Sequence, residues 1–278
     1  MRRPAVRERL KPEEIARRAR SIRRRIIRMN AGAGQGHTGA DLSETDILAT
    51  LFFNVLNVGP DRLDDPERDR FILSKGHGIG GFYCMLAEAG YIDEALLPTY
   101  LKFDSPLPGH PVRQKTPVIE LNTGALGHGL SVGGGLALAG RMSGRGYRVF
   151  VLTGDGELQE GSVWEAAMSA ARFQLGNLVV IVDRNTLQLA DRTETIMPLE
   201  PLADKWRAFG FEVQECSGHD PAALIATIGA LDTAGTKPHV IIARTVKGRG
   251  VSFIEDQAAW HHKVPVAGQV DRAIEELE

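Results

Sequence analysis

Three short apolar runs, each rich in β-branched residues, constrain the fold of this chain more than any other feature of its sequence. They lie at residues 148–152, 178–183 and 239–245, and turn residues bound each of them. Apolar runs of this length are typical of buried strands. The stretch 162–173, between the first two runs, is rich in alanine and predicts a crossover helix. Because buried strands alternate with helical patterns, we expect an α/β fold of three layers, α/β/α, around a mostly parallel sheet.

Helical patterns mark other parts of the chain as well. In the predicted crossover helix, one apolar face comprises Trp164, Ala167, Met168 and Ala171. Ser43 and Asp46 have the spacing of a capping box, and apolar residues follow them at helical intervals until the chain reaches residues 57–60. A further helix is expected at residues 130–142, within a glycine-rich stretch that begins at residue 124.

The first 30 residues are strongly basic, although the whole chain has a formal net charge of only −2. They contain 12 Lys and Arg against 3 acidic residues, a balance that suits a transit peptide or a nucleic-acid-binding arm. Within residues 11–30, however, an apolar stripe at helical steps comprises Ile15, Ala16, Ala19, Ile22, Ile26 and Met29. The stripe and the acidic Glu8, Glu13 and Glu14 favour a docked first helix with a solvated arginine face, and no nucleic-acid partner.

Composition excludes several classes of protein. A chain of 278 residues with 43% apolar and 24% charged residues is neither disordered nor fibrous. No stretch approaches the roughly 20 apolar residues that span a bilayer, and no signal-peptide core follows the basic start. Cys84 and Cys216 are the only cysteines, and neither has the further cysteine or histidine residues nearby in the sequence that a disulfide framework or a zinc site requires. We expect a reduced, cytoplasmic protein without a membrane partner, with one domain at residues 1–266 and a polar helix or arm at 267–278.

A Gly-Asp-Gly sequence directly follows the first predicted strand. Gly154 and Gly156 allow a tight turn, and Asp155 places a carboxylate in the crevice where open α/β sheets bind ligands. The helix start that follows offers free N–H groups and the positive end of a dipole. This arrangement suits Mg²⁺ or Ca²⁺ with a phosphate-bearing ligand. An isolated Gly-Asp-Gly is also typical of a plain strand-to-helix turn, so the motif alone leaves both interpretations open.

A second polar residue follows the next predicted strand. Asn185 lies thirty residues after Asp155, which is the length of one strand-helix-strand unit. Neighbouring parallel strands would deliver both side chains to the same edge of the sheet, where an amide oxygen suits a hard cation. The alternative is that Asn185 only forms a turn.

Five sequence signatures, in order, resemble those of transketolases. Gly154-Asp155-Gly156, followed one crossover later by Asn185, is similar to the thiamine diphosphate motif of transketolases, decarboxylases and oxo-acid dehydrogenases. The transketolase-like segments are 71–77, 109–111, 124–129, 154–161 and 245–250. The resemblance runs from about residue 15 to about residue 262. It implies the thiamine-diphosphate-binding fold, specifically the domain that holds the diphosphate, known as the PP domain.

The resemblance implies a metal ion and thiamine diphosphate at the end of the sheet. Asp155, Asn185 and the backbone carbonyl of Leu187 would hold Mg²⁺, or Ca²⁺ or Mn²⁺, beside two diphosphate oxygens. The residues that would bind the cofactor are His37, Lys75, His77, Gly124, Leu126, Gly154, Asp155, Gly156, Glu157, Asn185, Lys247 and His261. Glycines in the stretch 124–135 also allow the backbone to approach a phosphate, although close helix packing would explain them as well.

Histidines and two glutamates complete the implied site. The transketolase histidines that surround the diphosphate, the reactive thiazolium and the sugar hydroxyls correspond to His37, His77, His110 and His261. Imidazoles suit this work because they donate to ligand oxygens and carry protons near neutral pH. Glu160 and Glu165 match carboxylates at the interface between transketolase subunits, which link two active sites by a proton relay. We expect His219 and His239 to be structural.

The sequence departs from the transketolase pattern at a few positions. His128 stands where glutamine is usual, and residues 189–191 differ near the expected aminopyrimidine. Trp260-His261-His262 replaces a Trp-His-Gly sequence, which leaves open whether His261 or His262 faces the site.

The resemblance also implies a missing half. In transketolases a second domain supplies the glutamate that protonates the aminopyrimidine of the cofactor. We therefore expect a separately encoded C-terminal subunit with a pyrimidine-binding domain, in an α2β2 assembly. The complex would transfer a two-carbon ketol unit from a ketose, often phosphorylated, to an aldose, as in the pentose phosphate pathway.

Two alternatives stay open. One is the corresponding half of a related enzyme, such as dihydroxyacetone synthase or deoxyxylulose-phosphate synthase. The other is a non-catalytic cofactor-binding or regulatory protein. His37, His110 and the Trp260-His261 pair favour transketolase over an oxo-acid dehydrogenase subunit.

Overall fold

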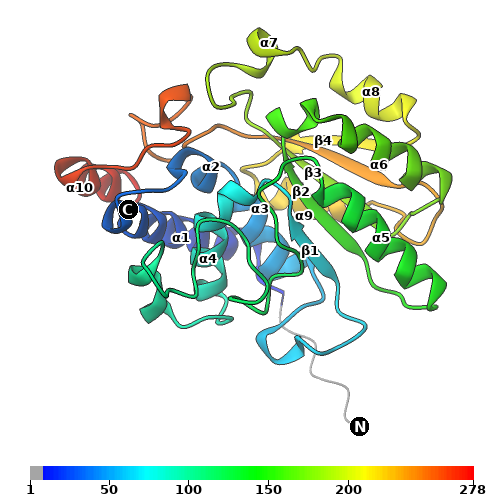
Figure 1. Ribbon diagram of the computed structural model, residues 1–278, viewed down its shortest axis with the longest axis horizontal. Coiled ribbons are helices and arrows are strands. Elements are labelled where there is room, and N and C mark those ends of the chain that lie inside the picture. Colours follow the sequence, from blue (N-terminus) through cyan, green and yellow to red (C-terminus); the bar gives the residue numbers. More distant parts are fainter. Residues whose placement is uncertain (1–8) are drawn as a thin grey trace.

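A five-stranded parallel sheet forms the centre of the computed structural model, which describes residues 9–278 (Figure 1). The strands are β1 (Arg70–Leu73), β2 (Val149–Gly154), β3 (Leu178–Arg184), β4 (Glu212–Ser217) and β5 (His239–Arg244). They lie in the order β1-β2-β3-β5-β4, and every neighbouring pair is parallel. The three predicted strands and the predicted α/β class are confirmed.

Helices cover both faces of the sheet, as the prediction of three layers requires (Figure 1). The helices packed on one face are α1 (Pro12–Ala33), α3 (Thr45–Thr50), α4 (Ile79–Glu88) and α9 (Pro221–Gly229), with α10 (Ala267–Glu276) against α1. The helices on the other face are α5 (Gly129–Met142), α6 (Gly161–Arg172) and α8 (Leu202–Ala208). Each layer therefore has its own apolar core.

The strand sequences explain why two cores form. Along β2, Phe150 and Leu152 belong to the core under α1, whereas Val149 and Val151 belong to the core under α5. Successive side chains of a strand point to opposite faces, so a sheet covered on both sides needs an unbroken apolar run. The apolar runs that predicted β2, β3 and β5 are unbroken in this way.

Shorter helical turns connect these elements. They are α2 (Thr38–Ser43), α7 (Thr193–Ile196), a π-helical turn (Leu51–Val55) and the 3₁₀ turns Pro60–Arg62, Gly76–Gly78, Glu94–Thr99, Gly156–Gln159 and Ala258–Trp260. Within residues 9–278, no helix combines the length and the apolar character needed to span a membrane.

Residues Pro12–Ala33 form the docked helix that the apolar stripe predicted. The predicted solvated arginine face is wrong at Arg23, which is only 5% exposed and pairs with Asp46. In α1, Ile15, Ala19, Ile22 and Ile26 are completely buried. The part of the predicted arginine face that falls on residues 1–8 lies outside the described residues.

Two local predictions were wrong. In α6 the buried residues are Val163, Ala167 and Ala170, while Met168 is 56% exposed, so the buried face is rotated by about one residue from the predicted one. Ser43 does not begin a helix, because it closes the last turn of α2. Its hydroxyl donates to Ala40 O and to Asp183 Oδ2, and the helical path continues through α3.

Two strands had no distinct signal in the sequence. β1 has only four residues, which is too short for a periodic pattern to stand out. β4 is an edge strand, and most of its side chains are exposed and polar. An edge strand needs an apolar run less than a central strand does, because less of it is covered.

Candidate active site

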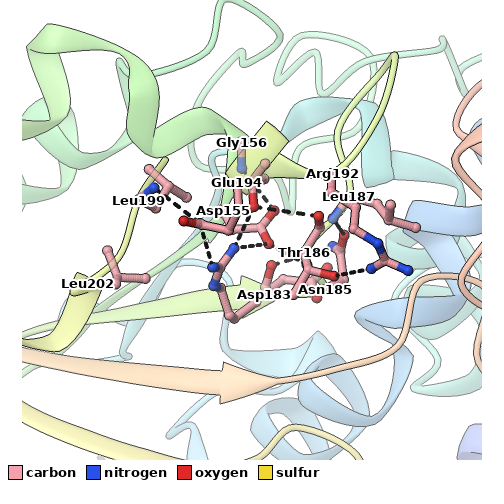
Figure 2. Close-up of polar contacts among 12 residues, drawn as sticks. Asp155, Gly156, Asp183, Asn185, Thr186, Leu187, Arg192, Glu194, Leu199 and Leu202 are labelled. Atoms are coloured by element: carbon pink, nitrogen blue, oxygen red, sulfur yellow. Dashed lines mark hydrogen bonds and ion pairs between the residues drawn. The ribbon is translucent and has the colours of Figure 1, made fainter. Parts of the chain in front are cut away.

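The predicted metal ligands lie together where β2 and β3 end at the same edge of the sheet (Figure 2). Asp155 follows β2, and its Oδ2 accepts hydrogen bonds from the Thr186 N–H at 2.6 Å and from Arg184 Nη1 at 3.1 Å. Asn185 follows β3, and its Oδ1 accepts from the Leu187 N–H at 3.1 Å. The loops that follow β2 and β3 therefore bring together a carboxylate, an amide and the residue with the third predicted ligand, a backbone carbonyl.

These donors fit a hard cation. Carboxylate, amide and carbonyl oxygens are the ligands that Mg²⁺ and Ca²⁺ prefer. Within residues 9–278, no group of three or more His, Cys, Asp and Glu side chains is arranged to hold a metal, so a cation here would depend on the Asn185 amide and the Leu187 carbonyl. Burial raises the pKa of the Asp155 carboxyl, as does the charge of Asp183, while Arg184 opposes both effects.

A cavity of about 270 Å³ lies beside the loops that follow β2 and β3. Its lining from the two strand ends comprises Gly154, Asp155, Gly156, Glu157, Gln159, Asn185, Leu187, Gln188 and Leu189. Its lining from other parts of the chain comprises Ala40, Lys75, His77, Leu126, Lys247 and His261. Most of the predicted cofactor-binding residues thus line one cavity at the carboxyl edge of the sheet, where open α/β sheets bind ligands.

Lys75 is fixed beneath the cavity by two buried carboxylates. Its Nζ lies 2.6 Å from Asp183 Oδ2 and 3.0 Å from Glu44 Oε2. Burial disfavours the charged ammonium, but Asp183 and Glu44 outweigh this effect and raise the pKa of Lys75 above its usual value. Ser43 and Thr245 also donate to Asp183. Lys75 is therefore a permanently charged, immobile part of the site.

Lys247 differs from Lys75 because it forms no ion pair with a carboxylate of residues 9–278, although the charges of Asp155 and Asp183 act on it. Its Nζ donates to Leu187 O at 3.1 Å and lies 2.9 Å from His261 Nδ1. Burial lowers the pKa of Lys247 to about 8, and the charge of Lys75 contributes to the decrease. A buried ammonium without an anionic partner is well suited to a negatively charged ligand.

Five histidines cluster beside the cavity, and two of them, His77 and His261, line it. The ring centroid of His37 lies 5.2 Å from that of His77, 5.6 Å from His261, 4.7 Å from His262 and 6.4 Å from His110. Segments at residues 37, 77, 110 and 261 converge here, as the resemblance implied. His110 is exposed, whereas His37, His77 and His261 are half-buried.

The inner histidines are neutral near pH 7. Burial lowers the pKa of His37 to about 4 and that of His261 to about 3, and it also lowers the pKa of His77. The positive charges of Lys75 and Lys247 add to the effect in each case. Neutral imidazoles each carry one N–H donor and one acceptor nitrogen.

The structure distinguishes His261 from its neighbour His262. His261 lines the cavity and contacts Lys247, whereas His262 is exposed and packs against the ring of His37. His261 therefore faces inward, and His262 extends the cluster toward solvent.

Glycine and glutamate residues shape the walls. Gly124 has φ 141°, and an added Cβ there would lie 2.9 Å from His110 Cδ2. Glu157 is buried, and its carboxylate accepts hydrogen bonds from the Gly127 and Gly154 N–H groups and from Ser74. Glu157 therefore ties together the two loops that border the cavity.

Glu160 and Glu165 do not join the cavity. Glu160 precedes α6, Glu165 lies within it, and both side chains are exposed on the surface of the chain. His219 and His239 are also outside the cavity: His219 accepts from the Val246 N–H and pairs with Asp46, and His239 Nε2 lies 3.1 Å from Asp232 O.

Several residues at the site had not been identified from the sequence. Asp183 is the next-to-last residue of the apolar strand β3, and a carboxylate inside such a run was a signal that it has a buried partner. Glu44 is completely buried inside the helical segment that supports Lys75, although its sequence context resembles that of a surface residue. Arg184 directly precedes the predicted ligand Asn185 in the sequence, but only the folded structure shows that it contacts the other predicted ligand, Asp155.

Comparison with known proteins decides the family. The family model described as "Transketolase, thiamine diphosphate binding domain" matches residues 16–275. The chain belongs to this transketolase family. The matched span contains every segment that lines the cavity.

Similar proteins include transketolase subunits of comparable length. The chain is 56% identical over 267 residues to a subunit of the apulose-4-phosphate transketolase of Actinobacillus succinogenes, with 96% of each chain covered. It is 45% identical to a protein of the same name from Phocaeicola vulgatus, covering 92% of this chain and 90% of that one. A 6-deoxy-6-sulfo-D-fructose transketolase subunit of a Clostridium species is 38% identical, covering 95% and 96%.

Longer transketolases contain this domain as one part. Human transketolase is 37% identical over 93% of this chain, but only 41% of its own length is covered. The solved transketolase of Campylobacter jejuni superposes with a TM-score of 0.89 at 29% identity, covering 96% of this chain and 43% of that one. In those enzymes more than half of the chain lies outside the matched domain.

Proposed function

We propose that this protein is the diphosphate-binding subunit of a two-subunit transketolase, which transfers a two-carbon ketol unit from a ketose phosphate to an aldose. One observation carries this proposal: Asp155, Asn185 and Leu187 share a single cavity with neutral histidines and the unneutralised Lys247. The relatives named as transketolase subunits favour ketol transfer over dihydroxyacetone or deoxyxylulose-phosphate synthesis and over a non-catalytic role.

The proposed cofactors are thiamine diphosphate and a divalent cation. Asp155, Asn185 and the Leu187 carbonyl would hold Mg²⁺, or Ca²⁺ or Mn²⁺, because all three offer hard oxygen ligands. Lys247 would place a positive charge near the diphosphate, since its ammonium already lies beside Leu187 O. The Gly154 and Gly156 turn leaves space for the backbone to approach a phosphate.

Thiamine diphosphate supplies a carbanion nucleophile when it is bound. The histidines of this chain would orient the sugar and hold or move protons at its hydroxyl groups. His37, His77 and His261 are suited to this because they stay neutral near pH 7, so each can donate one proton and accept another. His110, which is exposed, would act at the entrance.

The proposed partner is a separately encoded subunit with a pyrimidine-binding domain, in an α2β2 complex. Three similar proteins of nearly the same length are themselves named as subunits of transketolases. The exposed Glu160 and Glu165 are proposed to lie at an interface between subunits, where a proton relay would connect two sites. The two free cysteines, Cys84 and Cys216, are consistent with work in the reducing cytoplasm.

The substrate is proposed to be a sugar phosphate, and apulose 4-phosphate is the first to test because two relatives carry that name. The pentose phosphates are the second choice. The purified chain should show no ketol transfer by itself, and activity should appear when the partner subunit is added. Full activity of the chain alone would overturn the two-subunit proposal.

The metal assignment has its own test in the reconstituted complex. Asp155→Ala should abolish Mg²⁺-dependent binding of thiamine diphosphate in calorimetry, because it removes the only charged ligand. Asp204→Ala, which changes an exposed aspartate on α8, is the matched control. Unchanged affinity of the Asp155 variant would remove this residue from the metal site.

A further inference from the structure

Arg184, the last residue of β3, forms a buried junction beside the proposed metal site. Its side chain is only 3% exposed. Nη1 donates to Asp155 Oδ2 at 3.1 Å and to Thr193 Oγ1 at 2.7 Å. Nη2 donates to Glu194 Oε1 and to Glu200 Oε1, each at 2.9 Å. One guanidinium therefore connects the carboxylate after β2 with three residues of the segment that follows β3.

That segment, residues 186–200, has few apolar anchors of its own. Leu189 is 69% exposed, Met197 is 55% exposed and Ile196 is 43% exposed, whereas Leu187 and Leu199 are buried near its two ends. Hydrogen bonds to Arg184 hold the middle of the segment where apolar burial does not. Because Gln188 and Leu189 line the cavity, the position of this segment determines the shape of one wall.

The start of the segment has a backbone conformation that needs support. Thr186 has φ 67°, in the left-handed region that β-branched residues rarely adopt. Both of its backbone polar groups are held: its N–H donates to Asp155 Oδ2, and its carbonyl accepts from the Thr193 N–H at 2.9 Å. Its hydroxyl also accepts from Arg192 Nη1 at 3.1 Å. Arg184 contacts both Asp155 and Thr193, so it fixes the partners that fix Thr186.

Arg184 also orients the Asp155 carboxylate. Oδ2 accepts from Arg184 and from the Thr186 N–H, whereas among residues 9–278 Oδ1 accepts only from the Gly156 N–H. Oδ1 is therefore the oxygen with more capacity left for another ligand.

The fold by itself does not require an arginine with these contacts at this strand end. Arg244 is the register partner of Arg184 on the neighbouring strand β5. Its side chain is 65% exposed and pairs with Glu215 at the surface. The same edge of the sheet thus holds one surface arginine and one buried arginine with four partners.

We propose that Arg184 is a positioning residue that joins Asp155 to the segment 186–200, so that the metal ligand and one wall of the cofactor cavity are set as a single unit. Its effect on the cofactor rests on the proposed function, while its effect on the segment does not. Loss of Arg184 would release the segment and weaken binding of thiamine diphosphate. Arg184 would act through Asp155, because it does not itself line the cavity.

The test compares Arg184→Met and Arg184→Lys with Arg244→Met in the reconstituted complex. Hydrogen exchange reports on residues 186–198, and calorimetry with Mg²⁺ reports the affinity for thiamine diphosphate. Arg184→Met should speed exchange in the segment and weaken the cofactor by about tenfold or more, the usual effect of removing a residue that orients a metal ligand. Arg244→Met should change neither.

Arg184→Lys should recover part of the cofactor affinity, because an ammonium restores a positive charge near Asp155. It should recover less of the exchange protection, because one ammonium cannot replace a planar fork with four partners. If Arg184→Met reduces the yield of folded protein, Glu200→Gln and Glu194→Gln each weaken one contact of Arg184 and should speed exchange in the same segment.

Unchanged exchange and unchanged affinity in Arg184→Met would overturn the proposal. Faster exchange with unchanged affinity would show that Arg184 stabilises the segment alone and would overturn its role toward the cofactor. If the wild-type complex binds no thiamine diphosphate with Mg²⁺, the proposed function fails, and the exchange data still decide whether Arg184 holds the segment.

Discussion

The inner histidines owe their neutral state to two buried lysines as well as to burial itself. Lys75 is charged because Asp183 and Glu44 surround it, and its field opposes a further positive charge on His37 or His77. A histidine whose pKa is far below its ordinary value is a donor and acceptor rather than a cation at pH 7. The chemistry of each residue here depends on neighbours that are distant in the sequence.

This electrostatic arrangement predicts how stability depends on pH. The pKa of His37 is about 4 in the folded chain against 6.5 as the ordinary value. Below pH 6.5 the unfolded chain therefore binds a proton that the folded chain does not, and stability falls as the pH decreases from 6.5 to 4. When the pH falls from 7 to 5, the free energy of unfolding should decrease more in the wild type than in His37→Gln. The difference between the two decreases should be on the order of 1 kcal/mol after solvent screening.

Urea denaturation of both proteins at pH 8, 7 and 5 measures this difference. Burial raises the pKa of Asp41 to about 6, which changes stability in the opposite direction, but it does so in both proteins. The two should have the same slope between pH 8 and 7. Equal losses between pH 7 and 5 would contradict the lowered pKa of His37.

His110 should differ from the inner histidines in what its removal changes. His110 is exposed, and it does not line the cavity beside Asp155. In the complex, His110→Ala should lower kcat by about a hundredfold, a typical effect of losing a proton-transfer group. The affinity for thiamine diphosphate should change little. Lys115→Ala, an exposed change in the same segment, is the control, and weaker cofactor binding with normal kcat would instead assign His110 to the cofactor.

At the scale of elements, some glycines of α5 are needed for helix packing, so phosphate binding is not their only explanation. Gly133 faces the sheet, and Gly140 lies against the ring of Tyr147. Gly135, in contrast, faces open space, since a Cβ added there would have no neighbouring atom within 4 Å. The glycine-rich stretch therefore combines positions that require a missing side chain with positions that do not.

A matched pair of substitutions tests this difference. An added Cβ at Gly133 would lie 2.5 Å from Val151 Cγ2 in β2, so Gly133→Ala should destabilise the chain by about 1–3 kcal/mol. Gly135→Ala should stabilise it by about 0.5–1 kcal/mol, because alanine is the better helix former and nothing obstructs it. Both free energies come from urea denaturation. Equal stabilisation by the two variants would show that α5 packs less closely on β2.

At the scale of the whole molecule, the first and last helices of the described chain pack together. Helix α10 contacts α1, and Ala273 and Leu277 are buried in the core under α1. Arg24 Nη1 donates to Leu277 O at 2.7 Å, and Ser252 Oγ donates to Glu276 at 2.8 Å. The domain boundary predicted at residue 266 stays a prediction, and these contacts give a way to test it.

Deletion of residues 267–278 should lower the free energy of unfolding by about 2–4 kcal/mol, because it exposes apolar surface of α1 and removes hydrogen bonds. Thermal and urea denaturation measure the change, and deletion of Glu278 alone is the control. A truncated chain as stable as the full one would show that the segment is a separate arm.

Much of the fold followed from local patterns. Strands β2, β3 and β5 were predictable because a strand covered on both faces needs an unbroken apolar run. The short β1 and the exposed β4 were not, because neither is long and apolar. The face of α6 was misjudged because Trp164 and Met168 are apolar in character, and only the packed sheet decides which side of a helix it covers.

The sequence by itself determined the family of folds, the edge of the sheet where Asp155 and Asn185 meet, and the set of histidines, because order and spacing along the chain carry that information. Only the tertiary structure decided that His261 rather than His262 lines the cavity, that Lys75 pairs with Asp183, 108 residues away, and that Arg184 joins two loops. Such contacts depend on how separate segments cross in space, and the electrostatics of a buried site depends on all of them together.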